Sequence, residues 1–341
     1  MRRGTAATAA RLGALAYRYR AGLLCVAIFA VMSVIAPRFL TTGNVRGILK
    51  ASSVNLPAAV GFTVVLICGQ LDLSVGSAMT MGGVVAVAMQ PQLGWAGSLA
   101  VAVALGSAVG MINGLLVAKL RINSFIVTLG MMILVRNAVL MYHDGTIPAE
   151  TYELSDWLQM PLAGVATPQV AATLLLAAAI AVLLSRTPVG RGFYLLGGNA
   201  ETAFYAGLRV DRYIIGAFVL SATLSAMGGA IVAMSEAVAS PTLGDSSLMA
   251  IVAAVIIGGT SMEGGKGSVA GTTVALVALT ALINGLSCRG AGYEIQLMAS
   301  GLVLASVILW DTCMLQRRRK RRGQRRDLLD EFCQPVDETA G

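Results

Sequence analysis

The sequence predicts an all-α, polytopic membrane protein with about ten transmembrane helices and both termini in the cytoplasm. The first observation is composition: 56% of the 341 residues are hydrophobic and only 12% are charged, whereas soluble domains carry about 25% charged residues. The second is length, because a span needs about 20 residues and the chain holds roughly ten spans with their loops. We therefore expect one membrane domain over residues 21–310, between cytoplasmic segments 1–20 and 311–341.

The distribution of Lys and Arg gives the expected orientation. These residues cluster in 1–20, 186–212 and 317–326, while residues 142–169 contain acidic residues and no Lys or Arg. Because cytoplasmic loops are rich in Lys and Arg, both ends and the 185–212 loop are predicted inside and 142–169 outside. The first segments also fit a signal peptide, but the long apolar run favours an uncleaved first span.

The predicted spans follow one another along the chain with alternating direction. They are residues 21–36, 56–68, 74–89, 97–117, 124–142, 170–184, 213–234, 248–257, 268–286 and 294–310. Residues 39–55 are expected to form an interfacial helix outside, although Arg38, Arg46 and Lys50 there run against the positive-inside rule. Residues 235–247 and 287–292 are predicted as outer connections.

Two spans carry features that need an explanation at membrane depth. Gly106, Gly110 and Gly114 recur every four residues and therefore share one helix face, which permits close approach of a neighbouring backbone. We interpret this face as a packing surface. Arg136 lies within the fifth span, and we interpret it as a side chain that extends to the outer interface.

A polar, glycine-rich stretch at 69–77, Gly-Gln-Leu-Asp-Leu-Ser-Val-Gly-Ser, places a carboxylate between two apolar runs. A charge in the membrane costs roughly 2.5–3.5 kcal/mol on insertion scales, so it rarely lacks a partner or a wet cavity. Asp72 has three readings: it lines a solute path, it pairs within the bundle, or it ends a helix in cytoplasmic water. A second glycine-rich break occurs at 258–268.

The 185–212 loop is the strongest candidate for a partner site. Asn199 can cap a short helix over residues 200–206, with Glu201 in its first turn and Gly207 as its stop. Such a helix at the inner surface has a shape that docks into a cleft on another protein. Composition alone leaves a merely solvated loop equally open.

The motifs exclude several other activities. Residues 258–268 lack the first glycine and the final Ser or Thr spacing of a phosphate-binding loop, so we expect no nucleotide on this chain. One histidine and scattered cysteines predict neither a catalytic constellation nor a metal site. The basic tail at 317–326 follows a span directly, so we expect it to anchor at the lipid surface and not to bind nucleic acid.

Three stretches together resemble the membrane permeases of ribose-type bacterial ABC importers, namely GQLDLSVGS at 69–77, GGNAETAFYAGLRVDR at 197–212 and GGTSMEGGKGSVAGT at 258–272. The resemblance covers residues 37–311 with matching order and spacing. It implies an inner-membrane permease paired with a second permease subunit, cytoplasmic ATPase subunits that use ATP and Mg, and a periplasmic or lipoprotein sugar-binding protein. Gln70 and Leu71 stand where the family usually has Gly and Ile, which leaves the substrate open.

The resemblance also implies that residues 198–207 form the coupling helix that docks on the ATPase, and that this chain is not itself an enzyme. The candidate coupling residues are Gly198, Asn199, Glu201, Thr202 and Gly207. The candidate residues of the translocation path are Asn55, Gln70, Asp72, Ser74 and Asn284.

The expected function is import of a small sugar, ribose-like or a related polyol, and an autoinducer-2-like furanosyl compound is the alternative substrate. The main alternative mechanism is an ion-coupled secondary transporter, in which Asp72 or Glu263 carries the coupling ion or proton near broken helices. A non-transporting membrane scaffold is the weaker alternative.

Overall fold

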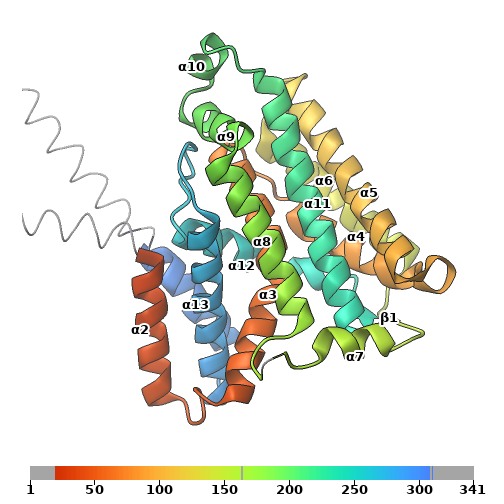
Figure 1. Cartoon of the computed structure of the whole chain (residues 1–341), viewed down its shortest axis with the longest axis vertical. Coiled ribbons are helices and arrows are strands. Elements are labelled where there is room, and N and C mark those ends of the chain that lie inside the picture. Colours follow the sequence, from red (N-terminus) through yellow and green to blue (C-terminus); the bar gives the residue numbers. More distant parts are fainter. Residues whose placement is uncertain (1–19, 163, 308, 310–341) are drawn as a thin grey trace, which may run out of the picture.

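The computed structural model describes residues 20–162, 164–307 and 309, and these form a bundle of α-helices (Figure 1). The predicted segments 1–20 and 311–341 lie outside the described residues, apart from Arg20. The helices before the inner loop are α2 (Arg20–Ile35), α3 (Thr42–Ile67), α4 (Val75–Ala88), α5 (Gln90–Ala118), α6 (Ser124–Tyr142), α7 (Glu153–Gln159) and α8 (Pro168–Arg186). After it come α9 (Pro188–Gly198), α10 (Ala200–Tyr205), α11 (Val210–Glu236), α12 (Leu243–Ile257), α13 (Val269–Cys288) and the helix Tyr293–Val307.

Within the described residues, six helices are long and apolar enough to cross a membrane, namely α3, α5, α6, α8, α11 and α13. Four more apolar helices are shorter: α2, α4, α12 and Tyr293–Val307. Every predicted span coincides largely with one of these helices. The predicted all-α, multi-pass architecture is therefore confirmed in its class.

Helix α11 lies at the centre and packs against α3, α4 and α5. The glycine face of α5 makes this packing possible. A Cβ atom on Gly110 would overlap the backbone of Phe218 and Val219, and one on Gly114 would fall 2.7 Å from the Cα of Ile215. The predicted close helix contact is confirmed, and its partner is α11.

The predicted division of residues 39–68 into an outer interfacial helix and a short second span is wrong, because α3 is one continuous helix. The hydroxyls in the middle of this helix are satisfied within the helix itself: Ser52 Oγ donates to the Ile48 carbonyl at 2.7 Å and Ser53 Oγ to the Lys50 carbonyl at 2.7 Å. Pro57 is buried inside the helix and faces Gly228 of α11. Packing in the bundle thus compensates for the backbone donor that a proline lacks.

The cations near the start of α3, which ran against the expected charge rule, bind groups at the same end of the bundle. Lys50 Nζ lies 3.0 Å from the Glu236 carboxylate and donates to Gln159 Oε1 at 2.8 Å. Arg46 donates to the Gly164 carbonyl. These positive charges therefore hold the connections between helices, which explains why they occur on the predicted outer side.

The two long connections lie at opposite ends of the bundle, with α9 and α10 at one end and α7 with β1 at the other (Figure 1). Strand β1 (Ile147–Pro148) pairs antiparallel with β2 (Val238–Ala239), so the 142–169 segment is joined to the end of α11. The predicted outer loop 235–247 is too long, because α11 continues to Glu236 and α12 begins at Leu243. The span predicted over 97–117 is also longer in the structure, because α5 begins at Gln90; it has a kink at Gly94, where φ is 67°.

Candidate coupling site and buried polar centre

Three chain segments meet backbone to backbone beside α9, and we call Ile67, Gly69, Gly197, Gly264 and Gly265 the glycine junction. The Gly265 N–H donates to the Ile67 carbonyl at 2.8 Å. A Cβ on Gly197 would overlap that same carbonyl, and one on Gly264 would fall 2.9 Å from the Gly69 Cα. Gly69, Gly264 and Gly265 have φ values of 75°, 82° and 69°, a region that glycine adopts without strain. The two glycine-rich breaks and the inner loop, separate in sequence, therefore form one contact.

A side chain secures the same contact from α9. The Tyr194 hydroxyl donates to the Gly267 carbonyl at 2.9 Å. Burial raises the pKa of the Tyr194 hydroxyl, so the group keeps the proton that it donates. The first part of the predicted inner loop forms the helix α9, and Thr187 caps this helix by accepting from the Gly190 N–H at 3.1 Å. The α9 helix is thus tied to the segment between α12 and α13.

The predicted short helix of the inner loop is present as α10. Asn199 Oδ1 accepts from the Thr202 N–H at 2.9 Å, as expected of a helix N-cap. At the other end Gly207 has a φ of 83°, and the Leu208 N–H bonds back to the Ala203 carbonyl at 3.1 Å. These contacts end the helix in the way predicted from the sequence.

Helix α10 presents most of its side chains to the surroundings. Glu201 and Thr202 are exposed, and only Ala203 is buried. The aromatic rings of Phe204 and Tyr205 are 65% and 79% exposed. Exposed aromatic residues next to polar ones are typical of protein interfaces. The segment therefore combines α9, which is held against the bundle, with α10, which exposes polar and aromatic side chains.

The second candidate site is a buried polar cluster of Asp72, Ser74, Asn113 and Ser221, which we call the Asp72 centre. Asp72 is fully buried. Its Oδ1 accepts from the Ser74 N–H at 3.0 Å and from Ser74 Oγ at 2.5 Å. Asn113 Nδ2 of α5 in turn donates to Ser74 Oγ at 2.9 Å, and the Ser221 hydroxyl of α11 faces the Asp72 carboxyl.

The Asp72 centre is incompletely satisfied. Asp72 Oδ2, Asn113 Oδ1 and Ser221 Oγ are buried and have no hydrogen-bond partner among the described residues. The Ser221 hydroxyl is near the Asp72 carboxyl but does not reach bonding geometry with it. The reading of Asp72 as a solvated helix end is wrong, since the residue is enclosed by α5 and α11. Sequence reasoning missed Asn113 and Ser221, because each is a single polar residue in another predicted span.

The other candidate path residues do not gather with Asp72. Asn55 is half-buried on α3 with an unpartnered Oδ1. The half-buried Gln70 closes the end of α3 through its N–H, which donates to the Val65 carbonyl at 3.1 Å. Asn284 lies near the end of α13 and accepts from Asn44 Nδ2 at 2.8 Å. Of the five, only Asp72 and Ser74 are hydrogen-bonded to each other.

Arg136 of α6 forms an ion pair, and the expectation that its side chain extends to the outer interface stays a prediction. Its Nη2 lies 2.6 Å from Asp245 Oδ2, on the first turn of α12. This ion pair could not be predicted from the sequence, because the two residues are more than one hundred positions apart.

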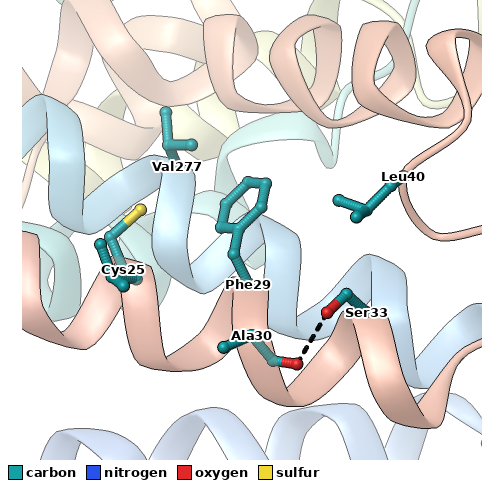
Figure 2. Close-up of a pocket in the computed structure, with 7 residues that line it drawn as sticks. Cys25, Phe29, Ala30, Ser33, Leu40 and Val277 are labelled. Atoms are coloured by element: carbon teal, nitrogen blue, oxygen red, sulfur yellow. Dashed lines mark hydrogen bonds between the residues drawn. The ribbon is translucent and has the colours of Figure 1, made fainter.

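A separate apolar hollow of about 540 Å³ lies between α2, the turn after it and α13 (Figure 2). Cys25, Phe29, Leu40 and Val277 line it, and the dashed hydrogen bond joins Ser33 Oγ to a carbonyl of its own helix. None of the candidate path or coupling residues lines this hollow. Its walls suit lipid chains better than a hydroxylated solute.

Comparison with known proteins identifies the family to which the chain belongs. Residues 44–309 match the family described as branched-chain amino acid transport system / permease component. The ribose import permease protein RbsC of Escherichia coli (strain K12) is 35% identical, with 83% of this chain and 90% of that protein covered. The L-arabinose permease AraH of Azospirillum brasilense is 30% identical over 86% and 91%, and the E. coli xylose permease XylH is 28% identical over 82% and 87%.

No solved structure matches the chain. The match to the family extends from early α3 to the helix that follows α13, and thus includes both the glycine junction and the Asp72 centre. The resemblance to permeases of ribose-type ABC importers is confirmed, and the chain belongs to this family of membrane-embedded transport permeases.

Proposed function

We propose that this chain is the permease subunit of an ATP-driven importer in the bacterial inner membrane and forms the path of a small sugar. It acts with a second permease subunit, cytoplasmic ATPase subunits that bind ATP and Mg, and an outer sugar-binding protein. Its termini and α10 face the cytoplasm, and α7 faces outside. The ten apolar helices supply the spans, with the four shorter ones completing the bundle.

The observation that carries this proposal is the attachment of α10 to the glycine junction. A movement of α10 passes through Asn199 to α9, and from Gly197 to the end of α3 and to the 258–268 segment. Backbone-to-backbone contacts leave no flexible side chain to absorb that movement. Beyond Gly69 the chain continues directly to Asp72, so the coupling segment and the buried polar centre are mechanically linked.

The substrate class follows from the relatives, whose names specify ribose, L-arabinose and xylose. Each is a small, uncharged, hydroxylated molecule, and we propose a ribose-like sugar or related polyol for this chain. An autoinducer-2-like furanosyl compound belongs to the same chemical class. We expect the binding protein, more than the permease, to choose among such solutes.

The test is crosslinking from α10 combined with variants of its two ends. In the assembled importer, Thr202→Cys should crosslink to the ATPase subunit. Glu201→Lys should weaken that crosslink and lower ATP-driven uptake at least tenfold at equal membrane abundance. Gly207→Val should do the same, because the left-handed conformation costs a residue other than glycine roughly 1–2 kcal/mol or more.

The matched control is Glu150→Lys, another exposed acidic position, at the opposite end of the bundle, which should transport normally. Normal uptake by Glu201→Lys and Gly207→Val, together with no crosslink from any position in 200–206, would contradict the coupling role. Uptake that collapses with an uncoupler while ATP stays high would instead favour an ion-coupled transporter.

A further inference from the structure

The Arg136–Asp245 ion pair lies at a depth where a charge is unexpected. Arg136 is on α6, which runs from Ser124 to Tyr142. At 1.5 Å per residue its Cα is about 18 Å from the inner end of the helix and about 9 Å from the outer end. The hydrocarbon layer is about 30 Å thick. The guanidinium is therefore attached well inside the membrane and not at its border.

The carboxylate partner is held at a fixed position by its neighbours. Asp245 follows Gly244, whose N–H donates to Thr80 Oγ1 of α4 at 2.9 Å. A Cβ on Gly244 would overlap the Gly76 carbonyl, so the start of α12 rests directly on the start of α4. Asp245 thus lies beside the first turns of α4, within the bundle. Gly76 belongs to the same motif as Asp72, which ties this position to the buried centre.

The pair is only partly covered by the chain. The Arg136 and Asp245 side chains are 47% and 38% exposed, although they lie 2.6 Å apart. The neighbouring Asn137 is exposed as well. Each charge in lipid costs roughly 2.5–3.5 kcal/mol on insertion scales, and membrane charges usually face the bundle interior or a water-filled cavity. This face of α6 and α12 is accordingly a poor lipid contact.

We propose that Arg136 and Asp245 lie on the wall of the solute's path and hydrogen-bond the hydroxyl groups of a passing sugar. This inference rests on the proposed function and identifies where that function meets its substrate. The guanidinium offers several N–H donors and the carboxylate offers acceptors, so together they suit neighbouring hydroxyls, which both accept and donate. Their charges cancel, and the wall therefore favours a neutral polyol over an ion.

A second copy of the chain could also cover this surface, but the pair is better suited to a path. Both charges are already neutralised within one chain, so neither requires a group from another copy. A buried interface would have to strip the remaining water from both ions, a cost that their attraction often fails to repay. A hydrated path leaves that water in place until a solute replaces it.

The first experiment measures contact with water and does not depend on transport. Met249 is one turn beyond Asp245 on α12 and 71% exposed, whereas Leu134 is 62% exposed and projects from α6 away from Arg136. In a full-length chain with its five cysteines changed to serine, Met249→Cys and Leu134→Cys are treated with a charged thiol reagent in open membrane fragments. We expect at least tenfold faster modification at position 249.

Equal and slow modification at both positions would mean that lipid or a second copy covers the face, and would overturn the proposal. This measurement remains valid even if the chain proves to be no part of an ATP-driven importer. Failure of the path assignment and failure of the proposed function are therefore distinguishable.

The second experiment exchanges the charges in the assembled importer. Arg136→Asp and Asp245→Arg should each lower sugar uptake at least tenfold, and the double exchange should recover a substantial part. Arg136→Gln and Asp245→Asn keep hydrogen-bonding groups without charge, and serve if the reversals do not fold; we expect each to raise the half-saturating sugar concentration. The control is Glu150→Lys, an exposed acidic position in the segment before α7, which should keep uptake within about twofold. Unchanged uptake and saturation in all Arg136 and Asp245 variants would overturn the proposal.

Discussion

Gly197 and Gly198 are adjacent in sequence and both lie beside Gly265, yet a side chain at each would meet different surroundings. A Cβ on Gly197 would overlap the Ile67 carbonyl and lie 2.6 Å from the Gly265 nitrogen. A Cβ on Gly198 would meet nothing within 4 Å. The backbone of both residues therefore belongs to the junction, but only at Gly197 does the packing exclude a side chain. Packing therefore requires glycine at position 197, whereas position 198 has room for a side chain.

The difference explains how the segment can transmit a movement. On the Gly197 side, α9 is held by backbone contacts and by the Tyr194 hydroxyl. On the Gly198 side, α10 touches the bundle mainly through Ala203. A partner that displaces α10 therefore displaces α9 as well, and through the glycine junction it displaces the segment that leads to Asp72.

The strongest test of this comparison is Gly197→Ala. Its methyl group should force the Ile67 carbonyl away and break the 2.8 Å bond from Gly265. Overpacking of this kind typically costs about 1–3 kcal/mol, so the melting temperature in detergent should fall by several degrees. Sugar-stimulated ATP hydrolysis in the assembled importer should fall about tenfold. A fully stable, coupled Gly197→Ala importer would show that the junction yields easily and transmits nothing.

A comparable loss of stability is expected at the far end of the link, the Asp72 centre. Asp72→Ala removes the acceptor of the Ser74 N–H and hydroxyl and leaves them buried, at about 1–3 kcal/mol for an unsatisfied group. Asp72→Asn keeps an oxygen acceptor and should cost less. Thermal unfolding and uptake at equal abundance should both rank wild type above Asn and Asn above Ala. Normal uptake by Asp72→Ala would separate this centre from transport.

Some of this arrangement could be predicted from the sequence, because the signals are local. Apolar runs of sufficient length located the helices, and the spacing from Asn199 to Gly207 predicted α10. The four-residue spacing of Gly106, Gly110 and Gly114 predicted a packing face, although not its partner α11. A pattern that repeats within one helix can be interpreted from the sequence, because all of its residues belong to the same local structure.

What the sequence could not predict depends on contacts between distant segments. Nothing distinguishes Gly197 from Gly198 until the Ile67 carbonyl is in place. Asn113 and Ser221 look like isolated polar residues until they meet Asp72. The Arg136–Asp245 pair could not be predicted, because the close approach of Gly76 and Gly244 positions the start of α12. Helix α3 was divided in error because Arg46 and Lys50 resembled the cations of an interfacial helix, whereas they bind Gly164 and Glu236 in the connections between helices.

The smallest expected effect belongs to Gly198→Ala, which completes the comparison. The added methyl group meets open space and Gly198 ends α9, where alanine is at least as favourable as glycine. We expect stability within about 0.5 kcal/mol of the wild type, as for surface positions in general. Uptake should stay within about twofold, and the Thr202→Cys crosslink should persist. A Gly198→Ala importer that is stable and crosslinks normally, yet no longer couples ATP hydrolysis to uptake, would contradict the transmission of movement from α10 through α9. It would mean that the chain must bend at Gly198 during the transport cycle, so that α9 and α10 are joined by a hinge.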